Sequence, residues 1–219
     1  MAEVIFRGRA QTAEGTARRE VAVTDGVITN IRPEPVAGPT PQVIELADDE
    51  ILLPGLVDTH VHVNEPGRTE WEGFATATAA AAAGGVTTIL DMPLNSIPAT
   101  TSVEALAVKR AAARGQCAVD VGFWAGAVPD SLGALAALHE AGVFGFKCFL
   151  LDSGVPEFPP LSTGQLRQAM TEIAAFDGLL IVHAEDPEVI GPTPRRARCA
   201  TPTSSPPGRR PPRPAPSTR

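Results

Sequence analysis

From residue 51 onward the sequence alternates short apolar, β-branched runs with longer, often alanine-rich segments. The apolar runs cover residues 51–57, 86–92, 119–125, 144–150 and 179–184. The segments between them have helical composition, with capping serines or terminal glycines, and cover residues 71–83, 102–114, 131–141 and 163–176. Strands that alternate with helices of this length predict parallel βαβ units in an α/β fold. Five such strands are the first part of a (β/α)8 barrel, whose functional residues lie at the carboxyl ends of the strands.

Residues 1–50 lack this alternation and predict a small β-module ahead of the barrel. Strand-like runs occur at 4–9, 19–23, 27–31 and 43–46. Asp25-Gly26 predicts a hairpin, because Asp-Gly suits a two-residue turn with positive φ angles. We therefore expect an N-terminal β-module over 1–50 and a partial barrel over 51–190, with its first helix starting at Thr69 or Glu70.

The last stretch, 191–219, lacks the features of a folded domain. After Gly191 there are seven arginines, nine prolines and no acidic residue. This stretch contains no aliphatic side chain larger than alanine, so it cannot bury a core and is expected to be disordered. The abrupt change near Ile190 suggests a shifted reading frame, a hypothesis that the nucleotide sequence beyond codon 190 would test.

The composition of the remaining chain excludes several classes of protein. Residues 1–191 carry 11 basic and 25 acidic side chains, hence a net charge of −14, which does not favour nucleic-acid binding. No apolar run is long enough to cross a membrane, and the start does not resemble a signal peptide. Three widely spaced cysteines form neither a disulfide framework nor a Cys-x-x-Cys site. We expect a cytoplasmic protein that binds neither nucleic acid nor membranes.

The first apolar run leads into Asp58-Thr59-His60-Val61-His62. Because side chains alternate faces along a strand, His60 and His62 point the same way. Two imidazoles at this spacing can bind one metal ion. The alternative is one core histidine and one surface histidine, but two of the chain's four histidines stand here, which favours the metal site.

The only two lysines, Lys109 and Lys147, lead to different expectations. Lys147 lies in an aromatic strand, where burial lowers the pKa of its ammonium group. The neutral amine can add carbon dioxide to give a carbamate, whose two oxygens can bridge two metals. The alternative is a lysine that extends out of the strand end into solvent. Lys109, beside Arg110 on a helix, is expected on a solvated face.

The other two histidines differ in position. His183 ends the fifth apolar run, at the same end of the predicted barrel as His60, His62 and Lys147, so it is a candidate ligand. Its alternative is a hydrogen-bonded core histidine. His139 lies within a predicted helix, away from any strand end, and is not expected to bind a metal.

Several sequence motifs occur together between residues 54 and 185. They are Pro54-Gly55-Leu56-Val57-Asp58-Thr59-His60-Val61-His62, Glu65-Pro66-Gly67-Arg68, Trp71-Glu72-Gly73-Phe74, Gly84-Gly85-Val86-Thr87-Thr88, Met92-Pro93-Leu94-Asn95, Gly145-Phe146-Lys147-Cys148-Phe149 and Val182-His183-Ala184-Glu185. In combination they resemble the cyclic amidohydrolases (dihydroorotase, hydantoinase, allantoinase), most of all the allantoinase subgroup.

The resemblance implies a β-sandwich plus (β/α)8 barrel with two divalent metal ions, usually zinc, and homotetrameric full-length relatives. Carried over residue by residue, His60 and His62 would bind one metal. Lys147, as N6-carboxylysine formed with carbon dioxide, would bridge to a second metal held by His183. Water activated at such a centre attacks a ring amide carbonyl. In the allantoinase subgroup this opens allantoin to allantoate in purine catabolism.

Two asparagines bear on the substrate. Dihydroorotases generally have arginine in the position of Asn64 to bind the substrate carboxylate, so Asn64 favours an uncharged ring. Asn95, after the second strand, either donates to a ring carbonyl or forms a turn beside Pro93.

The resemblance also implies a histidine on the sixth barrel strand and an aspartate on the eighth, the general acid/base. No histidine follows His183 and no acidic residue follows Glu188. We therefore expect an allantoinase-like cyclic amidohydrolase that is inactive as this truncated chain. The alternatives are a hydantoinase, dihydropyrimidinase or dihydroorotase activity, a non-catalytic amidohydrolase-like binding protein, and a half-barrel that dimerises.

Overall fold

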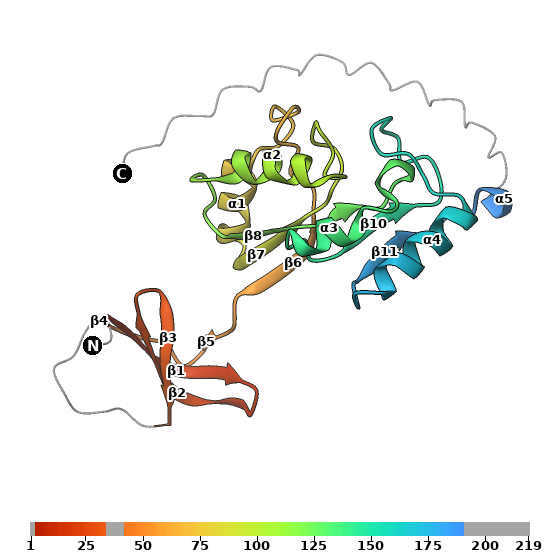
Figure 1. Ribbon diagram of the computed structural model, residues 1–219. Coiled ribbons are helices and arrows are strands. Elements are labelled where there is room, and N and C mark those ends of the chain that lie inside the picture. The colour runs from red at the N-terminus through yellow and green to blue at the C-terminus, as the bar shows by residue number, and fades with distance from the viewer. Residues whose placement is uncertain (1–2, 34–41, 191–219) are drawn as a thin grey trace, which may run out of the picture.

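The structure is a computed structural model that describes residues 3–33 and 42–190. An N-terminal sheet is followed by a larger α/β part, and the chain passes from one to the other between β5 and β6 (Figure 1). The predicted tail, 191–219, lies outside the described residues. Within the described ranges, none of the helices is long and apolar enough to cross a membrane.

The N-terminal part is one five-stranded sheet built around its first strand. Its strands are β1 (Val4–Thr12), β2 (Gly15–Thr24), β3 (Val27–Arg32), β4 (Gln42–Glu45) and β5 (Ile51–Leu52). β1 to β3 pair antiparallel in succession, and β4 and β5 pair parallel with β1. Asp25 and Gly26 have φ angles of 50° and 73°, so the Asp-Gly hairpin is confirmed. The sandwich and the boundary at residue 50 stay predictions.

The α/β part contains parallel strands whose order in space follows the chain. They are β6 (Leu56–Val61), β7 (Val86–Asp91), β8 (Asp120–Phe123), β9 (Ala125–Gly126), β10 (Phe146–Phe149) and β11 (Leu180–His183). β6 to β8 form one parallel sheet and β9 to β11 a second. Only Trp124 separates β8 from β9. A hydrogen bond from Phe144 N to Phe123 O (2.9 Å) continues from one sheet to the other.

Helices follow the strands, as the alternating pattern predicts. They are α1 (Phe74–Ala83), α2 (Val103–Ala113), α3 (Leu135–Glu140), α4 (Thr163–Ala174) and α5 (Pro187–Ile190), with a 3-10 turn, η1 (Pro129–Ser131), before α3. Ser102 Oγ accepts a hydrogen bond from Ala105 N (3.1 Å), and Ser162 Oγ accepts one from Gln165 N (3.3 Å). Both serines therefore cap α2 and α4 as expected.

Three element boundaries differ from the prediction. The apolar run 51–57 is divided, because Pro54 and Gly55 separate β5, which joins the N-terminal sheet, from β6. α1 begins at Phe74 rather than near residue 70, because Glu65 Oε2 accepts the hydrogen bond of Phe74 N (2.9 Å). The third helix is shorter than predicted, since Pro129–Ser131 forms the separate 3-10 turn.

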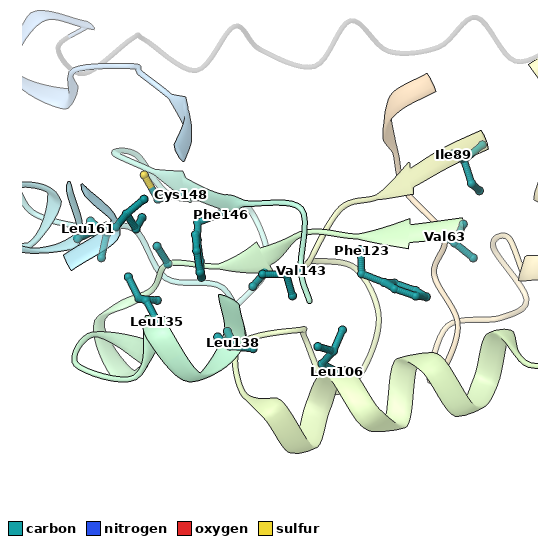
Figure 2. Close-up of a cluster of buried hydrophobic side chains, with 14 of the residues drawn as sticks. Val63, Ile89, Leu106, Phe123, Leu135, Leu138, Val143, Phe146, Cys148 and Leu161 are labelled. Carbon is teal, nitrogen blue, oxygen red and sulfur yellow. The ribbon is translucent and has the colours of Figure 1, made fainter. Parts of the chain in front are cut away.

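Alternation along the strands sorts side chains onto two faces. Val63, Ile89, Phe123 and Phe146 belong to one buried cluster, which also contains Leu106 of α2 and Leu135 and Leu138 of α3 (Figure 2). Their neighbours Leu90 and Trp124 belong to a second cluster, with Ile181 packed against it. The first cluster therefore joins the strands to the helices, and the second lies on the opposite, inner face.

Candidate metal centre

β6 and the residue directly after it direct two imidazoles to the inner face. Val61 packs against the helix-side cluster and Val63 is part of it. His60 and His62, which alternate with these valines, lie on the other face with ring centroids 5.4 Å apart. Burial and the charges of His60 and Lys147 lower the pKa of His62, which favours the neutral imidazole that a metal requires.

Lys147 is buried on the same inner face, in the middle of β10. Phe146 and Cys148 on either side of it belong to the helix-side cluster. Only 5% of Lys147 is exposed, and its Nζ lies 4.9 Å from the centroid of the Phe149 ring. Burial lowers the pKa of its ammonium group. The lysine is thus inside the protein rather than extended into solvent, and its carboxylation stays a prediction.

A hollow of about 450 Å³ connects the two strands that carry these residues. It is lined by Thr59, His60, Leu90, Trp124, Phe144, Lys147, Leu179, Ile181 and Val182. The structure therefore brings His60 and Lys147 to one space. His62 and His183 are not among the residues that line it.

His183 lies at the carboxyl end of β11 and is partly exposed. Its ring stacks on Phe149, with centroids 4.9 Å apart and an interplanar angle of 15°. Lys147 Nζ contacts the same ring, so both proposed ligands pack against Phe149. His183 Nε2 is 2.8 Å from Glu185 Oε1. A metal could use this nitrogen only if Glu185 moved away.

The two candidate substrate residues lie in the loops after β6 and β7. Asn64 is 8% exposed, and its Oδ1 has no hydrogen-bond partner among the described residues. Asn95 has a φ of 76°, and its Nδ2 is 3.3 Å from His62 Nδ1. Arg68 Nη1 donates to the carbonyl oxygen of Asn95 (2.9 Å). Asn95 thus combines a left-handed turn with a contact to a proposed ligand, and its contact with substrate stays a prediction.

The donor set fits a divalent metal if a lysine carbamate completes it. His60 and His62 supply two imidazoles on one face, and Lys147 supplies a buried amine whose lowered pKa suits carboxylation. Histidine, cysteine and carboxylate side chains alone do not form a group of three suitable for a metal within residues 3–33 and 42–190. His139 is remote from this set and stacks on Phe176, with centroids 4.5 Å apart.

The sequence reasoning missed a buried ion pair behind the site. Lys109 is fully buried, so its predicted place on a solvated face is wrong. Its Nζ lies 2.8 Å from Asp91 Oδ2, at the end of β7. The spacing of Leu106, Lys109 and Ala113, which share the buried face of α2, was a signal that could have revealed it.

Arg68 forms a second unforeseen contact, between the loop after β6 and the loop after β10. Its guanidinium pairs with the Glu157 carboxylate and lies 5.2 Å from the centroid of the Trp71 ring. Together with its bond to Asn95, this contact connects three of the loops at the carboxyl ends of the strands.

Comparison with known proteins identifies the family. A model described as the amidohydrolase family matches residues 51–207, which is more than half of the chain. The chain belongs to the amidohydrolase family. Among curated relatives, the allantoinase of Streptomyces avermitilis is 56% identical over 195 residues, covering 89% of this chain and 44% of that protein. The allantoinase of Saccharomyces cerevisiae is 58% identical over 137 residues, covering 63% and 30%.

Solved structures give the same family assignment. The L-hydantoinase (dihydropyrimidinase) of Arthrobacter aurescens matches this chain with a TM-score of 0.78 and 31% identity, covering 85% of this chain and 41% of that one. The α/β fold is therefore that of the amidohydrolases. The chain spans less than half the length of the relatives it matches.

Proposed function

We propose that this chain forms the first half of a (β/α)8 amidohydrolase barrel that opens a cyclic amide ring, with allantoin as substrate and allantoate as product. The observation that carries the proposal is the placement of His60, His62 and Lys147 on the inner face of the parallel strands, with His60 and Lys147 lining one hollow. The 56% identity to a protein named allantoinase favours allantoin over other cyclic amides.

In this proposal His60 and His62 hold one divalent ion, zinc by family resemblance, and His183 holds a second. Such ions supply Lewis-acid activation of water and of a ring carbonyl. Because burial lowers the pKa of Lys147, its amine is neutral at a lower pH than that of a surface lysine, and it is available to add carbon dioxide. The resulting anionic carbamate would offer two oxygens as metal ligands. His183 Nε2, which lies 2.8 Å from Glu185 Oε1, would have to leave that contact to bind the second ion.

The substrate is an uncharged ring in this proposal. The hollow beside Lys147 is walled mainly by the apolar side chains of Leu90, Trp124, Phe144, Leu179 and Ile181. Asn64 and Asn95 are the proposed polar contacts of the ring. A carboxylate, such as that of dihydroorotate, would require an arginine fork that Asn64 cannot supply.

We also propose a cytoplasmic location and a homotetrameric assembly for the full-length enzymes, with no nucleic-acid or membrane partner. The curated frog relative is named a mitochondrial allantoinase, a statement that concerns that protein.

The test measures zinc-dependent ligand binding and ring opening by the purified 219-residue chain. We expect allantoin to bind at least about tenfold more tightly than dihydroorotate, because an uncharged pocket leaves a carboxylate unpaired. His60→Ala/His62→Ala should lose this binding. Ring opening is the second readout, for which the sequence-based expectation is inactivity. Family-like turnover would overturn the expected inactivity, and tighter binding of dihydroorotate would overturn the substrate assignment.

A hydantoinase or dihydropyrimidinase activity is the second candidate, favoured by the match to the Arthrobacter aurescens structure. Tighter binding of hydantoin than of allantoin in the same assay would select it. Failure of all three ring compounds to bind the zinc-loaded chain would favour an amidohydrolase-like protein without catalytic function.

A further inference from the structure

The buried ion pair behind the proposed metal centre has its polar contacts directed at one short segment of backbone. Asp91 and Lys109 are 1% and 0% exposed at their side chains, and Asp91 Oδ2 and Lys109 Nζ lie 2.8 Å apart, outside the angles of a directed hydrogen bond. Asp91 Oδ1 accepts a hydrogen bond from Val63 N (2.7 Å). Lys109 Nζ donates to Val63 O (2.6 Å) and lies 5.3 Å from the centroid of the Phe74 ring.

Val63 directly follows His62, at the point where β6 leaves the sheet. β6 ends at Val61, and its pairing with β7 shifts register between Asp58 and Val61. The last backbone contact of the strand is the hydrogen bond from Met92 N to Val61 O (2.7 Å). Among the described residues no strand pairs with the chain at Val63, and the side chains of Asp91 and Lys109 bond to its backbone instead.

Both peptide groups that flank His62 are therefore anchored. The group before His62 is held through Val61 O by Met92, and the group after it is held through Val63 N by Asp91. These anchors fix the backbone angles of His62 and hence the direction of its Cα–Cβ bond. The Val63 side chain, fully buried beside Ile89 and Phe123, fixes the same point from the helix side (Figure 2).

Stability alone is a weak reason to bury this pair. Removing two charges from water is costly, and well-packed apolar residues of similar volume often replace a buried ion pair at no loss of stability. The pair is instead suited to specifying one geometry for the strand end, since it offers an acceptor and a donor at fixed positions.

We propose that Asp91 and Lys109 are positioning residues of the metal centre, which act through the backbone of Val63 to aim the imidazole of His62. The inference rests on the proposed function, because it takes His60 and His62 as metal ligands. It predicts that hydrogen bonding to Val63, rather than charge, is what the centre needs.

The experiment compares four variants with the wild-type 219-residue chain. Asp91→Leu/Lys109→Met removes both side-chain hydrogen bonds to the backbone of Val63. Asp91→Asn/Lys109→Gln keeps a neutral acceptor and a neutral donor for Val63. Arg7→Met/Glu20→Leu removes a comparable pair, with Glu20 buried, in the N-terminal sheet. His60→Ala/His62→Ala removes the proposed ligands. The readouts are unfolding by urea, Co²⁺ affinity from the visible spectrum, and amide exchange of the metal-free chain over residues 60–63.

We expect Asp91→Leu/Lys109→Met to unfold at the same or higher urea concentration, to exchange the Val63 amide faster, and to bind Co²⁺ at least about tenfold more weakly. Asp91→Asn/Lys109→Gln should stay within about threefold of the wild-type affinity, and so should the N-terminal control. If Asp91→Leu/Lys109→Met does not fold, the Co²⁺ affinity of Asp91→Asn/Lys109→Gln becomes the test. A loss of that affinity by about tenfold overturns the proposal. Unchanged Co²⁺ affinity in a folded apolar variant overturns it as well.

Failure of the proposed function is a separate outcome. If the wild-type chain binds Co²⁺ no more tightly than His60→Ala/His62→Ala, the metal centre is refuted, and with it the positioning role. Amide exchange at Val63 then shows whether the pair holds the strand end for another purpose.

Discussion

At the scale of single residues, the two lysines of the chain show how burial and pairing decide the chemistry of an amine. Lys109 is buried but has the Asp91 carboxylate at 2.8 Å. Lys147 is buried against Phe149, and no carboxylate forms an ion pair with it in the described part of the chain. Desolvation lowers the pKa of both ammonium groups. The Asp91 carboxylate opposes this shift at Lys109, whereas at Lys147 the opposing group is the thiol of Cys148, a weak acid whose own pKa is raised to about 11 by burial. This difference marks Lys147 as the reactive amine.

The carbamate of Lys147 can be observed directly. With ¹³C-bicarbonate, the wild-type chain should give a carbamate resonance, since burial favours the neutral amine that adds carbon dioxide. Lys147→Arg should abolish the resonance because a guanidinium remains charged. Asp91→Asn/Lys109→Gln, which replaces the only other lysine and keeps hydrogen-bonding groups for Val63, should retain it. A resonance that persists in Lys147→Arg would refute the assignment.

Asp91 should make stability depend on pH. Burial raises the pKa of its carboxyl from 3.8 to about 6 in the folded chain, although Lys109 opposes the shift. The folded state therefore binds this proton more tightly than the unfolded state. The stability that Asp91 contributes is complete below about pH 4 and decreases as the pH rises through about 6. Urea unfolding at several pH values should show the wild-type chain losing stability relative to Asp91→Asn over this interval, and a constant difference would contradict the account.

Local sequence could not reveal the partner of Lys109. The helix pattern indicated which residues share a face, but the carboxylate that makes burial possible comes from β7, distant in sequence. Asp91 itself ends an apolar strand, where a charged residue signals either function or a buried pair. His60 and His62 were predictable as a pair because strand alternation places them on one face, and Lys147 was predictable as a candidate because it lies in an aromatic strand of the same predicted barrel.

At the scale of elements, caps and turns were predictable where the signal is local. Ser102, Ser162 and Asp25-Gly26 lie beside the features that they stabilise. The start of α1 was not, because its cap is the Glu65 carboxylate, nine residues earlier along a loop. The division of 51–57 into β5 and β6 depends on a distant partner, since β5 pairs with β1.

Close approach of β10 to its neighbours explains the glycine before it. A Cβ atom at Gly145 would lie 2.6 Å from Trp124 Cζ3 and 2.8 Å from the carbonyl oxygen of Leu179. Gly145→Ala should therefore destabilise the chain by about 1–3 kcal/mol in urea unfolding. Gly164→Ala, a control in α4 whose Cβ would meet no atom closer than 4.0 Å, should raise stability by up to about 1 kcal/mol. Equal effects would show that the strands separate to accept the methyl group.

At the scale of the whole molecule, the order of the parallel strands and the family assignment agree with the sequence-based fold class. The N-terminal sheet adds a feature that no local pattern revealed. Val27, Ile28 and Ile31 of β3 are 62%, 59% and 48% exposed. An apolar hollow of about 460 Å³ on this sheet includes Ile28, Ile31 and Leu53 in its lining.

This apolar face should bind a hydrophobic dye. We expect anilinonaphthalene sulfonate to fluoresce with the native chain, and Ile28→Glu/Ile31→Glu to remove most of the signal by placing charges in the hollow. Val108→Glu, on the exposed part of α2, should leave the signal unchanged. Fluorescence that survives the β3 variant would locate the dye elsewhere.

The proposed metal centre of His60, His62 and Lys147 can be tested by the zinc content of the purified chain. After loading with zinc and dialysis, the wild-type chain should retain zinc, measured by mass spectrometry of the metal. His60→Ala/His62→Ala should retain almost none, and His139→Ala, whose ring packs on Phe176 instead, should match the wild type. Equal zinc content in the wild-type chain and in His60→Ala/His62→Ala would contradict the account.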